Sequence, residues 1–108
     1  MKLERVENFT GGWFIGDFTP SLLSTSDFEV CIKHFKKGDF EPNHLQKRAT
    51  EFTIVVSGLC RMGPITLSPG DILVLDPGEI SDFLAIEDSV VIGIKTPSIP
   101  EDKVLVGE

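Results

Sequence analysis

Glycine and proline interrupt this chain so often that long regular segments are excluded. The 108 residues contain ten glycines and seven prolines, spread along the sequence, and the apolar runs between them are short. No stretch has the apolar spacing of a long amphipathic helix. Short strands separated by turn signals are typical of an all-β sandwich or barrel. We therefore expect an all-β protein, a single antiparallel β-barrel with very little helix.

The expected strands follow from alternation and from the turn residues between apolar runs. Gly63 and Pro64 stand between two short apolar runs, which predicts a hairpin. Thr19 followed by Pro20 is typical of a helix start, so one helical turn is expected there. Strands are expected at residues 13–15, 28–36, 51–57, 59–62, 65–67, 72–75, 81–85 and 89–94.

Length and charge exclude several classes of protein. A chain of this length fits one domain with one core. It carries 17 acidic and 10 basic residues, a net charge of −7, so nucleic acid and anionic membrane surfaces are unfavourable partners. Its first residues are charged and lack the apolar centre of a signal peptide. Cys31 and Cys60 are too few for a disulfide framework and are expected to be buried free thiols, so a cytoplasmic location is expected.

The chemistry of the chain is concentrated between Gly38 and Gly58. The pattern there is G-x5-H-x-Q-x4-E-x6-G, in which the polar residues are His44, Gln46 and Glu51. Residues two apart on a strand point to the same face, so His44 and Gln46 are expected side by side. Glu51 begins the next strand and would meet them if the two strands pair. An imidazole, an amide and a carboxylate that converge make a polar pocket or a metal site.

This spacing resembles the first motif of the cupin superfamily, G-x5-H-x-H-x3,4-E-x6-G, with Gln46 in place of the second histidine. Residues 70–85 resemble the second cupin motif, G-x5-P-x-G-x2-H-x3-N. In that segment Ser81 stands where the motif has its histidine, and Ala85 stands where it has its asparagine. Two motifs in the right order are a more specific signal than either motif alone.

The resemblance implies one RmlC-like cupin domain over residues 1–108, with the first motif at 38–58 and the second at 70–85. Such a domain is a double-stranded β-helix, or jelly roll. Metal-binding cupins use two histidines and a glutamate from the first motif and a histidine from the second. By position these ligands would be the four residues His44, Gln46, Glu51 and Ser81.

A divalent metal such as zinc, iron, manganese or nickel is therefore the cofactor that the family implies. His44 and Glu51 keep strong ligand chemistry, whereas the Gln46 amide is a weak ligand and the Ser81 hydroxyl is weaker still. Two strong ligands are fewer than the three protein ligands of a catalytic zinc site or of the iron facial triad. The sequence thus predicts partial metal occupancy or none, with His44, Gln46 and Glu51 as the ligands if a metal binds.

Three functions are consistent with this sequence, and whether the chain is an enzyme stays open. The first is the binding of a small polar molecule in the lumen, at His44, Gln46, Glu51 and Ser81, with His34 as a further candidate that alternation could direct inward. The second is a metal-free sugar isomerase or epimerase, in which His44 is the base and Glu51 or Gln46 orients it. The third is a non-catalytic structural role.

A homodimer is expected in each case. A sheet protein of this size has edge strands that must be paired or covered. Residues 9–18 contain Trp13 and three phenylalanines, which is more apolar surface than one short strand needs. The cupin resemblance also implies pairing of this kind.

Overall fold

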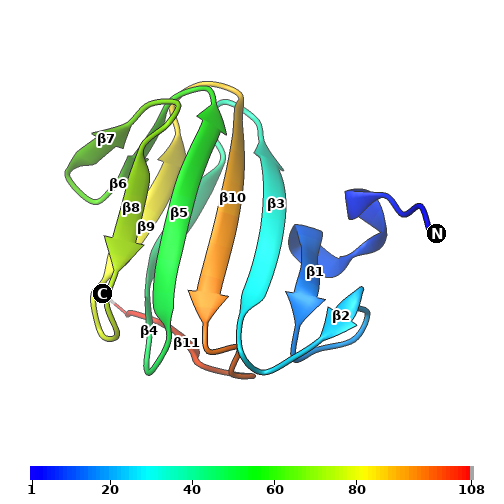
Figure 1. Cartoon of the computed structure of the whole chain (residues 1–108). Helices are drawn as coiled ribbons and strands as arrows, with labels where there is room; N and C mark the ends of the chain where they lie inside the picture. The colour runs from blue at the N-terminus through cyan, green and yellow to red at the C-terminus, as the bar shows by residue number, and fades with distance from the viewer. Residues whose placement is uncertain (108) are drawn as a thin grey trace.

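Two β-sheets face each other in the computed structural model, which describes residues 1–107 (Figure 1). Two short 3₁₀ turns, η1 (Val6–Asn8) and η2 (Thr10–Gly12), precede the sheets, and the described residues contain no α-helix. Within them no helix is long and apolar enough to cross a membrane. The six-stranded sheet has the order β2 (Leu23–Ser24), β1 (Trp13–Gly16), β3 (Glu29–Phe35), β10 (Ser89–Thr96), β5 (Thr50–Ser57), β8 (Ile72–Leu75). The five-stranded sheet has the order β11 (Lys103–Leu105), β4 (Phe40–Gln46), β9 (Ser81–Ala85), β6 (Cys60–Met62), β7 (Ile65–Leu67).

The all-β prediction is confirmed, but the prediction of one closed antiparallel barrel is wrong in two respects. First, the two sheets remain separate, because the turn after β7 carries the chain to the outer edge of the other sheet. In that turn the Ser68 N–H donates to the Asp71 carboxylate at 2.8 Å and is therefore not available for pairing with another strand. Second, β2 runs parallel to β1, which makes the larger sheet mixed.

The predicted helical turn after Pro20 is also wrong. The Leu22 N–H donates to the Phe14 carbonyl at 2.7 Å, and the Thr25 N–H donates to the Gly16 carbonyl at 3.3 Å. These bonds lay the segment along β1 as strand β2. Pairing with an existing strand outweighs the weak local preference for a helix start.

The core lies between the two sheets and is drawn from both. Its buried side chains are Val55, Cys60, Met62, Leu67, Phe83, Ala85 and Val91. Cys31 and Cys60 are both buried and free, as predicted. Burial raises the pKa of the Cys31 thiol to about 11, so it stays protonated and unreactive at neutral pH.

The four motif glycines all occupy turns that need a left-handed backbone. The φ angles are +92° at Gly38, +92° at Gly58, +95° at Gly70 and +85° at Gly78. At Gly58 a side-chain carbon would also collide with Ser89 and with the Asp88 carbonyl. Only glycine fits there without strain, which explains why the motif spacing is bounded by glycines.

The outer face of the six-stranded sheet is mostly apolar across four strands, with the exposed His34 on β3. None of the side chains that alternate outward on β3, β10, β5 and β8 is a lysine, arginine, aspartate or glutamate. Those at the β8 side are the most exposed, at 58% for Ile72, 46% for Val74 and 51% for Val56. A continuous apolar face of this kind is typical of a surface that another protein covers.

We predict that this face joins two copies of the chain. Two identical apolar faces can pack about a two-fold axis, as stacked sheets do. Light scattering should give twice the 11.9 kDa mass of the chain. The Val74→Asp variant should be monomeric, because a carboxylate on the face would be buried without a partner.

The control for the dimer is Ile65→Asp, which changes a comparably exposed residue, 47% exposed, on the other sheet. That variant should keep the mass of the dimer. A wild-type monomer at about tens of micromolar, well above the dissociation constants of stable interfaces, contradicts the prediction.

A buried carboxylate ties the segment before β11 to the turn between β4 and β5. Asp102 is 4% exposed. It accepts hydrogen bonds from the Arg48 N–H at 3.0 and 3.1 Å and from the Ala49 N–H at 2.9 Å. The Lys47 N–H donates to the Asp102 carbonyl at 3.0 Å. Asp102 alone thus attaches the turn between β4 and β5 to the segment before β11.

Removing this carboxylate should destabilise the protein far more than removing the nearest surface charge. Asp102→Ala leaves two turn N–H groups without their partner, and we expect it to lower the free energy of unfolding by about 3 kcal/mol. Arg48→Ala should change it by less than about 0.5 kcal/mol, since the guanidinium is exposed and its Nε lies 3.9 Å from Asp102 Oδ1. Urea denaturation of both variants tests this, and equal losses would contradict it.

Candidate functional site

The structure brings His44, Gln46 and Glu51 together on the inner faces of the two sheets. His44 and Gln46 lie two apart on β4 and are each 4% exposed. Glu51 comes from β5, in the opposite sheet. Gln46 Nε2 donates to Glu51 Oε2 at 3.1 Å, and His44 Nε2 lies 3.8 Å from the same oxygen. One carboxylate oxygen is thus the point where all three side chains meet.

Ser81 is placed directly opposite His44, where β4 pairs with β9. Its side chain is buried, and its Oγ donates to the neighbouring Asp82 carbonyl at 2.7 Å. The hydroxyl hydrogen is therefore used locally. Ser81 lies beside the cluster without a side-chain hydrogen bond to His44, Gln46 or Glu51.

His44 is oriented by its own strand. Its Nδ1 lies 3.1 Å from the Pro42 carbonyl, an arrangement in which Nδ1–H donates. In the neutral ring the lone pair is then on Nε2, which is the nitrogen directed at Glu51. The imidazole is thus fixed with an acceptor, or a metal-ligating nitrogen, toward the interior.

Glu51 is ionised at neutral pH despite its burial. Burial alone raises the pKa of Glu51, but a protonated His44 ring, the positive charge of Lys95 and the Gln46 amide together lower it below its ordinary value. The stabilisation from these partners is present above the ordinary glutamate pKa. It is lost when acid protonates the carboxylate.

Gln46 leaves one atom unsatisfied. Its amide nitrogen faces the Glu51 carboxylate, so its carbonyl oxygen Oε1 points elsewhere. This oxygen is buried and has no hydrogen-bond partner. Buried polar atoms in proteins are nearly always paired, and an unpaired one calls for a specific explanation.

The cavity beside His44 and Glu51 includes residues that the sequence did not single out. It measures about 40 Å³, room for one or a few water molecules. Trp13, Lys33 and Glu41 line it, and Lys33 Nζ pairs with Glu41 Oε2 at 3.4 Å. Lys95 Nζ lies 4.8 Å from the centre of the Trp13 ring.

The signal of these residues in the sequence is weak. Trp13 belongs to an aromatic segment whose composition indicates core or dimer contact. Lys33 and Lys95 are lysines within strands whose other inward positions are mostly small or apolar. A strand that carries a lysine on its buried side indicates a polar interior, and this signal could have revealed both residues.

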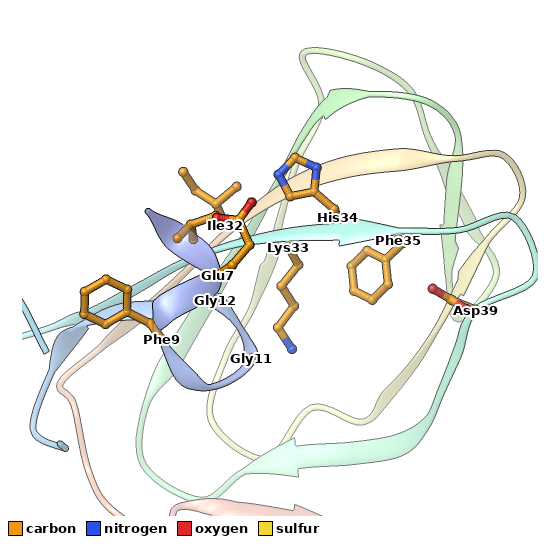
Figure 2. A pocket seen from close by; sticks show the side chains of 10 residues that line it. Glu7, Phe9, Gly11, Gly12, Ile32, Lys33, His34, Phe35 and Asp39 are labelled. Carbon is orange, nitrogen blue, oxygen red and sulfur yellow. The ribbon is translucent and has the colours of Figure 1, made fainter. Parts of the chain in front are cut away.

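His34 lies outside this pocket, contrary to its inclusion as a lumen candidate. Figure 2 shows that His34 and Lys33 leave opposite sides of β3. His34 is exposed and contributes to a groove of about 350 Å³ between β3 and the N-terminal 3₁₀ turns. That groove is larger than the cavity at His44 but contains none of the four motif residues.

The donor set at the cluster does not fit a resident transition metal. His44 Nε2 and Glu51 Oε2 are 3.8 Å apart, which is compatible with two ligands each about 2.1 Å from one ion. Gln46 presents its amide nitrogen rather than its oxygen, and the Ser81 hydroxyl is bonded to the backbone. Residues 1–107 contain no group of three histidine, cysteine, aspartate or glutamate side chains placed to hold a metal.

Comparisons with known proteins identify the fold. No protein-family model matches the chain, and no curated protein matches it either. Among solved structures, KdgF from Halomonas sp. is 28% identical, with a TM-score of 0.64 over 68% of this chain and 72% of the other. A conserved protein with a double-stranded β-helix domain from Klebsiella pneumoniae is 19% identical, with a TM-score of 0.73 over 99% of this chain and 93% of the other.

An RmlC-like cupin from Shewanella frigidimarina is also similar, at 18% identity and a TM-score of 0.61, over 71% of each chain. These similarities agree with the two facing β-sheets of this chain. The chain has the double-stranded β-helix fold of the cupin superfamily.

Proposed function

We propose that the chain binds a small polar molecule at the His44–Gln46–Glu51 cluster. The observation that carries the proposal is a cluster of two buried polar side chains, His44 and Gln46, around the Glu51 carboxylate, in which one acceptor atom, Gln46 Oε1, has no protein partner. Polar groups at such positions cost stability relative to apolar ones. A purely structural role would gain nothing from this cost, which argues against a non-catalytic structural function.

The arrangement also favours one catalytic alternative, a metal-free isomerisation or epimerisation. The Pro42 carbonyl fixes the His44 ring so that an unprotonated Nε2 faces the interior, as a general base requires. Glu51 stabilises the imidazolium that forms when this nitrogen takes a proton. Lys95, which stands opposite Glu51 where β10 pairs with β5, is a candidate for the acid that the reaction would also need.

We further propose that the site works without a resident metal. Gln46 donates a hydrogen bond to the carboxylate oxygen at which His44 and Gln46 meet. The Gln46 N–H thus lies against Glu51 as the positive partner, in the position that a metal ion would otherwise take. The two remaining strong donors, His44 and Glu51, are fewer than a closed site requires.

Replacing His44 should remove ligand binding and leave the fold intact. Wild-type protein, purified gently and denatured, should release a small molecule that mass spectrometry detects. His44→Ala should release none, because the acceptor nitrogen that faces the interior is lost. The circular dichroism spectrum of the variant should match that of the wild type.

The matched control is His34→Ala, which changes the other histidine of the chain, on the outer side of β3. It should retain the molecule at the wild-type level. The proposal fails if wild-type protein releases no small molecule and no polar compound raises its melting temperature, or if His44→Ala retains as much ligand as His34→Ala.

Restoring one histidine should create the metal site that this chain lacks. Gln46→His adds an imidazole two residues from His44 and completes a set of two histidines and one carboxylate, typical of metal centres in proteins. We expect the variant to bind cobalt or zinc more than about tenfold more tightly than the wild type, given a third protein ligand. Elemental analysis after dialysis against a chelator measures this.

Gln46→Leu is the control for this experiment, because it removes the amide without adding a ligand. It should bind no more metal than the wild type. A stoichiometric metal retained by the wild-type protein through the same dialysis would contradict the proposal of a metal-free site.

A further inference from the structure

A groove beside Gln46 is a second part of the site that the motifs do not reveal. It measures about 240 Å³ and lies between the loop after β1, the start of β3, the end of β10 and residues 98–103. Gln46, Glu29 and Lys95 line it together with Asp17. Its volume is six times that of the cavity at His44, so it can hold the body of a small molecule.

The wall of this groove is fixed before any ligand binds. Ser98 is 3% exposed, its Oγ accepts from the Asp17 N–H at 2.9 Å, and its N–H donates to the Ser26 carbonyl at 2.9 Å. Asp102 anchors the other end of the same segment to the β4–β5 turn. A preformed wall lowers the entropic cost of binding.

The charges that line the groove favour a positively charged ligand. Carboxylates of Asp17, Glu29, Glu101 and Asp102 face the ammonium groups of Lys95 and Lys103. Asp102 is occupied by backbone N–H groups. Lys95 stands opposite Glu29 of β3 on one side and opposite Glu51 of β5 on the other, so a single ammonium group serves two carboxylates there.

The negative charge of the Glu29 carboxylate is only partly compensated by its neighbours. Burial raises the pKa of Glu29, Lys95 and hydrogen bonding to Ser98 lower it, and the negative charges of Glu51 and Asp102 raise it, so that the pKa lies above its ordinary value. A carboxylate in this state gains from any cation placed beside it.

Gln46 supplies the second, independent observation. The residue is 4% exposed and lines the groove, and its Oε1 has no hydrogen-bond partner. A carbonyl oxygen accepts hydrogen bonds and cannot donate them. The missing partner is therefore a donor.

We propose that the groove binds a small polar molecule through an ammonium group, which donates to Gln46 Oε1 and lies beside the Glu29 carboxylate. This inference rests on the proposed function and names the chemical class of its ligand. A carboxylate or phosphate in the same place would face Asp17, Glu29 and the carbonyl of Gln46, and would be repelled.

Three probes that share the glucose ring and differ in charge test the ligand class. They are glucosamine, which is positive, glucose, which is neutral, and glucuronate, which is negative. Each is titrated into the ¹⁵N-labelled protein at slightly acidic pH, and backbone amide shifts are followed by NMR. We expect glucosamine to bind about fivefold more tightly than glucuronate, with glucose between them. The largest shifts should fall on Gln46, Lys95 and Ser98.

Two variants assign the interaction. Gln46→Leu should weaken glucosamine binding by about tenfold, because the acceptor is lost. Glu29→Gln should remove most of the preference for glucosamine over glucuronate, whereas Glu87→Gln, an exposed carboxylate outside the groove, should leave it unchanged. Equal or tighter binding of glucuronate by the wild type overturns the proposal, as does an unchanged preference in Glu29→Gln.

The failure of this inference is distinguishable from failure of the proposed function. If none of the three probes shifts the groove amides, the ammonium class is wrong. The molecule released by the wild type and lost in His44→Ala then still supports binding at the cluster. If the probes bind but shift His44 and Thr53 rather than the groove, the cluster binds ligand and the groove does not.

Discussion

The charge on Glu51 is the constraint on which the inner faces of both sheets depend. A carboxylate placed between two sheets is costly unless its oxygens are paired. Here an amide, an imidazole and a lysine surround it. The strands that supply these groups and the carboxylate are β4, β5 and β10, and they belong to two sheets, so the charge can be stabilised only when the sheets have come together.

Much of this arrangement could be predicted from the sequence, because it follows from local rules. Alternation and turn residues located most of the strands, and the spacing of His44, Gln46 and Glu51 indicated that these side chains meet. The route differs from the expected one, because β4 and β5 lie in opposite sheets and do not pair. The predictions that failed concern pairing between strands that are distant in the sequence. Whether β7 and β8 continue one ladder or separate two sheets depends on pairing across the molecule, and the parallel β2 depends on hydrogen bonds back to β1.

His34 illustrates a limit that is specific to this fold. The alternation of β3 groups His34 with Val30 and Ile32, and apolar neighbours suggest the interior. In this sheet the outer face is apolar as well, and the inner face carries Glu29, Lys33 and Cys31. Alternation identifies which residues share a face but cannot say which face is buried when the polar site lies inside. For the same reason Lys95 and Trp13 were not recognised as neighbours of Glu51.

The bonds between Asp102 and the turn at residues 48 and 49 join parts of the chain that are far apart in sequence. Their partners are 53 and 54 residues apart in the chain. During synthesis on the ribosome, β4 and β5 are complete long before Asp102 emerges, and the turn between them has no partner for its N–H groups until then. The sheet partners β9 and β10 also come later in the chain, so His44 and Glu51 reach their relative position only after residues 81–96 have been made. Contacts over such separations slow folding, and the candidate site depends on several of them.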